Sequence, residues 1–249
     1  MAARNFLQLV LILVLLFCQK NRAYAHDEFI EVIANSKPSI VRIEVLRTSK
    51  SIKSEAAIEA LGGYADFFSE DIEDQSKKVR GTGFVIDYDE DQFAYIMTAA
   101  HVVRGASKIK VAFQNARPKK ADVVWVSKKN DVALLKLKSS SYMQALEFEL
   151  EAIKEGQAVL ALSDSFNVSI SGAQGIVSAK DVILPSKKGV KLIQTDAATN
   201  PGSSGGVLLN KNGKVVGMIS NIYTKTGTFS GASFAVPAKV ILELIMSKK

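Results

Sequence analysis

The sequence predicts an all-β fold of two six-stranded antiparallel barrels, with one short helix before them and another after them. Residues 39–137 hold six short apolar or alternating runs, and residues 158–236 hold six more. A long connection, Ser139–Gly156, separates the two sets. Short strands bounded by turn residues are typical of β-sandwiches and β-barrels. A chain of 249 residues is long enough for two small barrels that share an interface.

Residues 1–25 are expected to be a secretory signal peptide. Arg4 gives the positively charged start, Phe6–Phe17 is an almost unbroken apolar run, and Ala23-Tyr24-Ala25 fits the small-x-small cleavage rule. The apolar run is shorter than the roughly 20 residues that span a bilayer. We therefore expect cleavage before His26 and no stable membrane span, with an uncleaved anchor as the alternative.

The first barrel is expected to occupy about residues 36–140. Before it, His26–Asn35 has apolar residues at helical spacing, and Pro38 ends that helix. Tyr88–Gln92 is the expected turn of a hairpin. The expected strands are 39–46, 81–87, 93–98, 109–113, 123–126 and 132–137.

The second barrel is expected over about residues 156–237. Asn212-Gly213 between two apolar runs is a strong hairpin signal, and Pro237 can begin a helix over Ala238–Met246. The whole domain is therefore expected to span residues 26–249. The expected strands are 158–162, 169–179, 190–196, 207–209, 214–220 and 233–236.

Charge, cysteine and histidine content argue against several classes of function. The formal net charge is +7, but residues 1–25 carry three basic residues and no acidic one, which leaves 29 basic against 25 acidic residues beyond them. This small and dispersed excess does not predict nucleic-acid binding. Cys18 is the only cysteine, and His26 and His101 are the only histidines. We therefore expect no disulfide, no metal site and no cofactor.

A glycine–serine loop, Gly202–Gly206, is the strongest candidate for chemistry. A serine between glycines on a tight turn can expose its hydroxyl and the flanking N–H groups, which is what acyl transfer needs. Upstream, His101 follows one apolar strand and Asp131 begins another. Taken singly, these residues have ordinary interpretations: a surface loop, a histidine at a helix start and a carboxylate at a strand edge.

Five segments together resemble the trypsin-like serine proteases, and within them the HtrA (Deg) branch. The order histidine, aspartate, serine is that of the chymotrypsin-type triad rather than that of subtilisin. The resemblance implies a trypsin-like fold and a serine endopeptidase that works through an acyl-enzyme. HtrA-like proteins usually continue into a PDZ domain, and none is expected here. The segments are TAAHVV, NDVALLKL, TDAATNPGSSGG, NKNGKVVGMIS and ASFAVPA, and they cover roughly residues 30–240.

The resemblance implies a role for each residue of the expected site. Ser204 is the expected nucleophile, His101 the general base, and Asp131 the partner of the other imidazole nitrogen. The oxyanion hole is expected in the loop of Gly202, Ser203 and Ser204, through the N–H groups of Gly202 and Ser204. Ser203 competes for the role of nucleophile, and the family pattern G-x-S-G-G selects Ser204.

Position 203 departs from the family pattern. Digestive trypsin-like enzymes have an aspartate before the nucleophile, which pairs with a newly cut N-terminus, and HtrA-like enzymes typically have asparagine. Ser203 is uncharged and shorter. Activation by N-terminal cleavage is therefore not expected, and the resting geometry of the oxyanion loop is left open.

The resemblance also implies where a substrate pocket lies. Its floor is set by the residue six before the nucleophile, Ala198, and one wall comes from Ser220, Asn221 and Ile222. A buried cation needs a charged partner, which Ala198 does not supply. We therefore expect cleavage after small or medium aliphatic residues rather than after lysine or arginine.

Residues 48–80 are expected to be a long polar insert without a strand pattern. It contains one aromatic cluster, Tyr64–Phe68. Loops of this length are usually functional or disordered. In the HtrA branch a long loop at this place carries aromatic residues and reaches toward active sites. Local packing of the aromatic cluster is the alternative, and both are left open.

The expected function is hydrolysis of unfolded or damaged polypeptides after export, in the periplasm or outside the cell. A processing protease with one native target is a narrower alternative. A non-catalytic binding or chaperone-like module on the same fold is the contrasting one. HtrA-like proteases commonly form trimers through their N-terminal segments, and Phe29, Ile30 and Ile33 offer an apolar face for a homotrimer.

Overall fold

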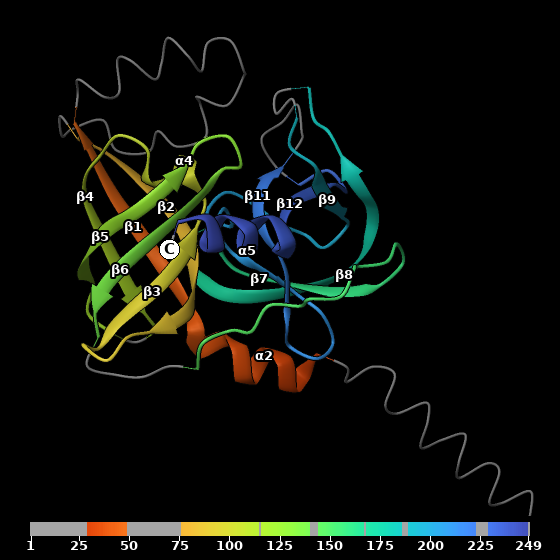
Figure 1. The fold of residues 1–249 in the computed structure, drawn as a ribbon, viewed down its shortest axis with the longest axis horizontal. Helices are drawn as coiled ribbons and strands as arrows, with labels where there is room; N and C mark the ends of the chain where they lie inside the picture. Colours follow the sequence, from red (N-terminus) through yellow and green to blue (C-terminus); the bar gives the residue numbers. More distant parts are fainter. Residues whose placement is uncertain are drawn as a thin grey trace, which may run out of the picture.

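The computed structural model describes residues 29–48, 76–114, 116–139, 144–166, 168–185, 189–222 and 229–248. In this part of the chain the strands form two closed six-stranded antiparallel barrels that lie next to each other (Figure 1). The predicted fold class is confirmed. The expected signal peptide, its cleavage site before His26 and the aromatic cluster Tyr64–Phe68 lie outside the described residues.

The first barrel closes in the order β1–β2–β3–β6–β5–β4. The ladder between β1 and β2 extends to the pair Thr48 and Ser76. The expectation that all of residues 48–80 form an insert without strands was therefore wrong at both ends of that stretch. In the run 76–80 only Val79 is apolar, and it is buried in the core; one apolar residue is too few to show a strand pattern. Residues 49–75 lie outside the described part. The strands are β1 (Ile40–Thr48), β2 (Ser76–Tyr88), β3 (Phe93–Thr98), β4 (Ala106–Phe113), β5 (Lys119–Ser127) and β6 (Val132–Lys138).

The second barrel closes in the order β10–β11–β12–β9–β8–β7. The expected hairpin at Asn212-Gly213 joins β10 to β11: Gly213 has a φ of +73°, and Asn210 Oδ1 accepts hydrogen bonds from the N–H groups of Asn212 (2.9 Å) and Lys214 (3.0 Å). Glycine adopts a positive φ at little cost, which explains why this signal was correct. The strands are β7 (Ala158–Ser165), β8 (Ser169–Val182), β9 (Leu192–Thr195), β10 (Val207–Leu209), β11 (Val215–Ile222) and β12 (Ser233–Pro237).

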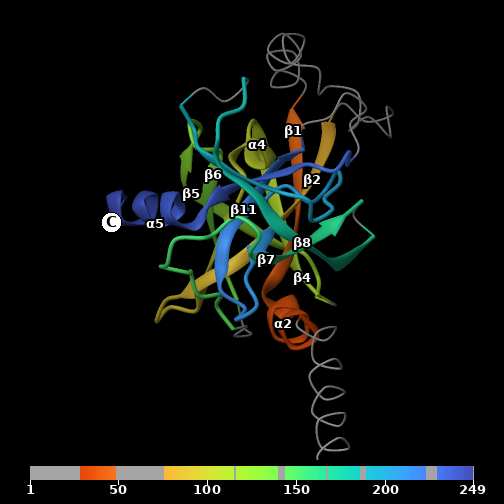
Figure 2. The same cartoon turned by 90° about the vertical axis from the view of Figure 1, so that its right-hand side faces the viewer.

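Short helices flank the barrels. The expected C-terminal helix is present. The single turn α4 after β3 was not among the expected elements, although a helix start was one interpretation of His101, because four residues are too few to show helical periodicity. Seen in two directions, α2 and α4 lie toward opposite ends of the molecule (Figures 1 and 2). No helix in the described part of the chain is long and apolar enough to cross a membrane. The helices are α2 (Ile30–Ser36), the 3₁₀ turn η1 (Lys37–Ser39), α4 (Ala100–Val103) and α5 (Ala238–Ser247).

The apolar residues around α2 serve mainly the chain's own core. Phe29 is 5% exposed, and Ile33 is half-buried and packs against the core beside Gly172. Only Ile30, which is 61% exposed, faces outward. A homotrimer through this face therefore stays a prediction that depends on Ile30 rather than on all three residues.

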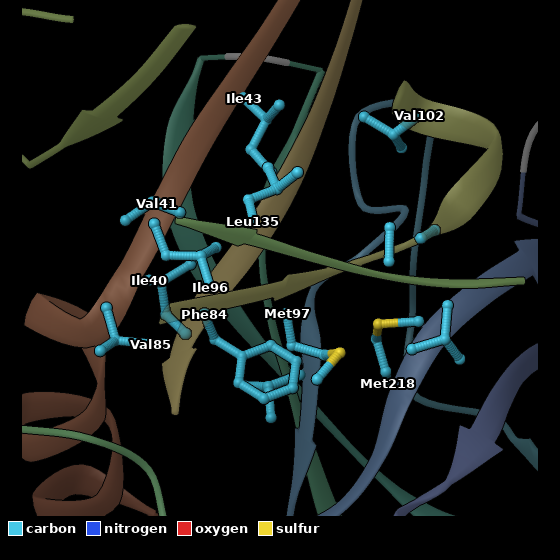
Figure 3. Close-up of a cluster of buried hydrophobic side chains, with 14 of the residues drawn as sticks. Ile40, Val41, Ile43, Phe84, Val85, Ile96, Met97, Val102, Leu135 and Met218 are labelled. Atoms are coloured by element: carbon cyan, nitrogen blue, oxygen red, sulfur yellow. The ribbon is translucent and has the colours of Figure 1, made fainter. Parts of the chain in front are cut away.

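One hydrophobic core runs through the interface between the barrels. Phe84 and Met97 of the first barrel belong to the same buried cluster as Met218 of β11, as Figure 3 shows. A smaller cluster around Val159 and Leu208 lies within the second barrel. Because protein cores are packed as densely as organic crystals, groups on facing strands of the two barrels are held at fixed separations.

Candidate active site

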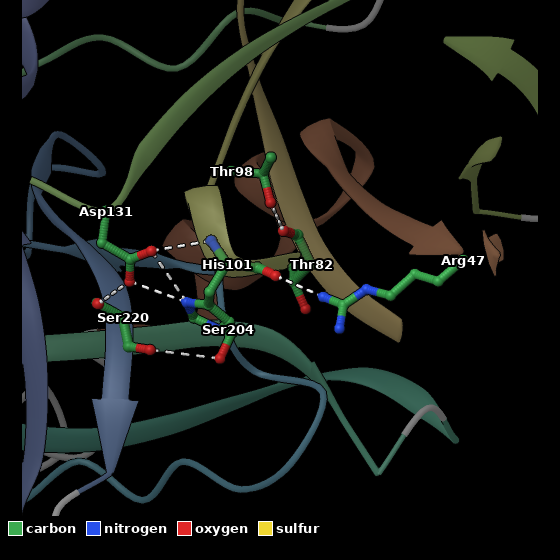
Figure 4. A network of polar contacts seen from close by, with 7 residues as sticks. All are labelled: Arg47, Thr82, Thr98, His101, Asp131, Ser204 and Ser220. Carbon is green, nitrogen blue, oxygen red and sulfur yellow. Dashed lines mark hydrogen bonds and ion pairs between the residues drawn. The ribbon is translucent and has the colours of Figure 1, made fainter. Parts of the chain in front are cut away.

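His101 and Asp131 form a close pair on the first barrel (Figure 4). Nδ1 of the imidazole is 2.9 Å from Oδ2 of Asp131 and 3.1 Å from Oδ1. The backbone N–H of His101 donates to Oδ1 of the same carboxylate at 2.9 Å. Asp131 is 4% exposed, whereas the His101 side chain is 33% exposed. A carboxylate at Nδ1 leaves Nε2 as the nitrogen that can exchange a proton with another group.

Local backbone structure holds this pair in place. His101 lies on α4, and Nη2 of Arg47 donates to its carbonyl oxygen at 2.8 Å. Asp131 precedes β6 with a φ of +57°, in a left-handed region that aspartate tolerates better than most residues. Its carbonyl accepts from the N–H of Ala100 at 3.2 Å. The turn before β6 is thereby tied to the first turn of α4.

Ser220 of β11 connects the pair to the second barrel. Its hydroxyl donates to Oδ2 of Asp131 at 2.5 Å, and its carbonyl accepts from Oγ of Ser204 at 3.4 Å. Sequence reasoning assigned Ser220 to a pocket wall and missed its contact with Asp131. No local signal reveals this contact, because the two residues are 89 positions apart and meet only when the barrels pack.

The structure brings Ser204 to the same place, on the loop between β9 and β10 (Figure 4). Within the described residues, its hydroxyl bonds to the carbonyl of Ser220 and not to the ring of His101. A distance of 3.4 Å is at the long limit for a hydrogen bond, so the hydroxyl is held weakly. Such loosely aligned bonds are common in sites without substrate.

The backbone of the glycine–serine loop contains two N–H groups that make no hydrogen bond within the described part of the chain. Gly202 has a φ of +94°, and the N–H of Ser203 donates back to the carbonyl of Asn200 at 2.9 Å. Among the described residues, none accepts a hydrogen bond from the N–H groups of Gly202 and Ser204. Neighbouring donors of this kind can stabilise a negatively charged oxygen.

Thr82 of β2 holds the loop from the side of the first barrel. Its N–H donates to the carbonyl of Ser204 at 2.9 Å, and its hydroxyl donates to the carbonyl of Gly202 at 2.7 Å. Gly205 has a φ of +85°, and a Cβ there would lie 2.1 Å from the carbonyl oxygen of Thr82. Both the conformation and the close approach require glycine at position 205.

The side chain of Ser203 points toward β7. Its side-chain oxygen is 2.9 Å from Oγ of Ser163, 2.8 Å from Oγ of Ser165 and 3.1 Å from the N–H of Asn200. The residue is 1% exposed. The sequence did not predict how the uncharged side chain of Ser203 would be held. In the structure it makes three neutral hydrogen bonds.

The structure describes part of the expected substrate pocket. Ala198 is half-buried. Asp196, two residues before it, is exposed, and its Oδ1 accepts from the N–H of Ile176 on β8 at 2.7 Å. The side chains of Asn221 and Ile222 lie outside the described part of the structure. The carboxylate of Asp196 is therefore bound to β8.

Two buried hydroxyls beside Ala198 were not anticipated from the sequence. Oγ1 of Thr199 and Oγ of Ser233 are 2.8 Å apart, and Ser233 also donates to the carbonyl of Ala197 at 3.0 Å. They fasten the segment after β9 to β12. Isolated serines and threonines carry no sequence signal for such a role.

The described residues contain no group of three His, Cys, Asp or Glu side chains that could hold a metal ion.

Comparison with known proteins identifies the class. The sequence model of the trypsin-like peptidase domain matches residues 81–218, more than half of the chain, so the chain belongs to the trypsin-like peptidase family. Its relatives within that family are of the HtrA/DegP type. A protein of Halomonas elongata named "Probable periplasmic serine endoprotease DegP-like" is 34% identical over 256 residues, covering 96% of this chain and 53% of that protein.

Further relatives agree with this placement. A protein of the same name from Pseudomonas savastanoi pv. phaseolicola is 40% identical over 164 residues, covering 66% of this chain and 33% of that protein. The solved structure "HtrA-type protease AlgW with tripeptide" superposes with a TM-score of 0.71 at 25% identity, covering 88% of this chain and 62% of that one. The chain spans about half the length of the curated relatives it matches.

We expect Gly205→Ala to lower the free energy of unfolding by more than Gly156→Ala does. Both glycines have positive φ, +85° and +80°, which costs another residue roughly 1–2 kcal/mol. Only at position 205 does the added methyl group meet backbone, since nothing lies within 4 Å of it at position 156. Overpacking adds about 1–3 kcal/mol. Urea unfolding followed by circular dichroism measures the difference, and equal losses would contradict the close approach to Thr82.

Proposed function

We propose that the chain is a serine endopeptidase whose catalytic groups are Ser204, His101 and Asp131. One observation carries the proposal. The buried carboxylate of Asp131 binds Nδ1 of His101 beside a loop in which the N–H groups of Gly202 and Ser204 have no acceptor among the described residues. Membership of the trypsin-like peptidase family and likeness to DegP-like endoproteases support the same chemistry.

The proposed reaction begins when the Ser204 hydroxyl turns from the Ser220 carbonyl toward Nε2 of His101. Its oxygen bonds to the carbonyl carbon of the scissile peptide while its proton passes to Nε2. Asp131 stabilises the imidazolium, and the hydroxyl of Ser220 keeps the carboxylate in place. The carbonyl oxygen becomes negative and accepts hydrogen bonds from the N–H groups of Gly202 and Ser204. Losing one such donor costs roughly 3–4 kcal/mol in other enzymes.

Collapse of this intermediate breaks the carbon–nitrogen bond of the substrate. The imidazolium of His101 gives its proton to the leaving amine, and Ser204 is left as an ester of the acyl fragment. Water then attacks the ester with His101 again taking the proton. The second collapse returns that proton to the Ser204 oxygen and releases the carboxylic acid.

Ser204→Ala is expected to abolish both peptide hydrolysis and covalent labelling by a serine-directed phosphonate, because it removes the attacking oxygen. Ser203→Ala is the matched control: its hydroxyl bonds to Ser163 and Ser165, so the variant should keep measurable labelling. Intact mass spectrometry reads out the label. If Ser203→Ala lost the label and Ser204→Ala kept it, the nucleophile would be Ser203. A folded wild-type chain that takes no label would instead favour the non-catalytic binding module.

We propose unfolded or damaged polypeptides as the substrates and a pocket that favours small or medium aliphatic side chains. Ala198 carries no charge, and the carboxylate of Asp196 is already bound by the N–H of Ile176. A lysine or arginine side chain bound at Ala198 would therefore lack a charged partner. Discrimination among aliphatic residues should be loose, because one methylene in an apolar pocket changes binding by only about 1–3 kcal/mol.

Digestion of a model protein tests this specificity. We expect the unfolded form to be cut mainly after Val, Ala and Ile, and the folded form to resist, because only an unfolded chain can present extended segments to the site. Mass spectrometry of the fragments maps the cut sites. A majority of cuts after Lys or Arg would show that Ala198 is not the pocket floor. Cleavage of one site in one folded protein would indicate the processing protease.

We propose that the chain is exported to the periplasm and trimmed before His26. The cleavage rule met by Ala23-Tyr24-Ala25 supports this, as do the periplasmic names of the DegP-like relatives. The intact mass of the protein recovered from the periplasm is expected to begin at His26. A mass that still includes Cys18 would show that the leader is kept as an anchor.

A further inference from the structure

Asp164, near the end of β7, is a buried charge that the proposed reaction does not use. Its side chain is fully buried; Oδ2 accepts a hydrogen bond from Nε of Arg42 on β1, and no residue in the described part of the chain donates to Oδ1. The Arg42 side chain is 42% exposed, and its hydrogen bond to Asp164 raises the pKa of the guanidinium. The pair is therefore a charged link between the first barrel and the second.

The residues on either side of Asp164 bind the side chain that precedes the proposed nucleophile. Oγ of Ser163 is 2.9 Å from Oγ of Ser203, and Oγ of Ser165 is 2.8 Å from it. Ser203 in turn accepts the N–H of Asn200, which closes the turn of the glycine–serine loop. The position of β7 therefore determines where this turn lies.

Backbone groups of the same segment also bind the loop. The N–H of Asp164 donates to Oγ1 of Thr82 at 3.0 Å, and Oγ1 of Thr82 donates to the carbonyl of Gly202 at 2.7 Å. The N–H of Phe166 donates to the carbonyl of Pro201 at 2.7 Å. Residues 163–166 thus contact two successive peptide units of the loop, directly or through Thr82.

We infer that the Arg42–Asp164 ion pair positions the oxyanion loop, by holding residues 163–166 against β1 and so keeping the N–H groups of Gly202 and Ser204 turned toward the site. Arg42 and Asp164 are positioning residues, since neither contacts the proposed reacting groups. Without Arg42 the carboxylate would be buried with no partner on either oxygen among the residues that the structure describes, and the segment would have to shift to bring it to water. The inference rests on the proposed function.

The test uses Arg42→Gln with Asp164→Asn in one chain, which removes both charges together and leaves no unpaired buried charge. The matched control is Lys120→Gln with Asp122→Asn, because these residues form a 3.1 Å ion pair that is exposed on β5. Arg42→Lys, which keeps the charge, is the rescue variant. All chains are full-length and are compared at a temperature at which circular dichroism shows them folded.

We expect the double variant at 42 and 164 to lower kcat on a peptide substrate by about 10–100-fold, somewhat less than the loss of a whole oxyanion donor. KM should change by less than about threefold, because the loop acts on the transition state rather than on substrate binding. The rescue variant should stay within about threefold of wild type in kcat. The Lys120/Asp122 control should match wild type in both constants.

Amide hydrogen exchange measured by NMR gives a readout that does not depend on catalysis. The N–H groups of Ser203 and Gly206 donate within the loop, to Asn200 and Ser203 respectively. Their exchange should become at least about tenfold faster in the double variant, while that of Gly213 in the β10–β11 turn stays unchanged. The wild-type chain could hydrolyse no peptide while the double variant still shows faster exchange confined to the loop. That result would support the positioning role and reject the proposed function. Wild-type kcat together with unchanged exchange would overturn the positioning role.

Discussion

The buried carboxylate of Asp131 is the group on which the arrangement of the site depends. A negative charge that is 4% exposed is tolerated only when hydrogen-bond donors surround it. These donors come from both barrels, since His101 belongs to the first and Ser220 to the second. The contact that orients the imidazole therefore also favours one way of packing the two barrels.

The hydrophobic core makes that packing stiff enough for chemistry. Met97 and Met218 belong to one buried cluster across the barrel interface, and Thr82 of the first barrel binds the carbonyls of Gly202 and Ser204 in the second. A displacement of about 1 Å can cost an enzyme a hundredfold in rate. A site divided between two barrels therefore needs an interface as dense as a protein interior, which the shared core provides.

Two of the four described residues other than glycine that have a positive φ belong to the site or contact its loop, while Gln92 and Asp181 lie elsewhere. Asp131 and Phe166 have φ values of +57° and +56°; the carbonyl of Asp131 accepts from the N–H of Ala100, and the N–H of Phe166 donates to the carbonyl of Pro201. Left-handed residues other than glycine cost about 1–3 kcal/mol and persist only where the surroundings enforce them. Here the surroundings are α4 for Asp131 and the glycine–serine loop for Phe166.

Local patterns in the sequence were enough to predict the two sets of six strands and the turn at Asn212-Gly213, and the resemblance to the HtrA branch indicated the residues proposed for catalysis. Alternation, apolar runs and the need for glycine at positive φ act over a few residues, so they can be recognised locally. The extension of β2 to Ser76 and the single turn α4 were not among the expected elements, because the first has only one apolar residue and the second is too short for periodicity.

Which distant side chains meet depends on tertiary packing and cannot be read from the sequence. Ser220 reaches Asp131 across 89 positions, and Arg42 reaches Asp164 across 122. The same packing directs the hydroxyl of Ser203 to β7, whereas the hydroxyl of Ser204 bonds to the carbonyl of Ser220. These contacts depend on barrel closure and on the packing of one barrel against the other, and no local preference of the chain carries that information.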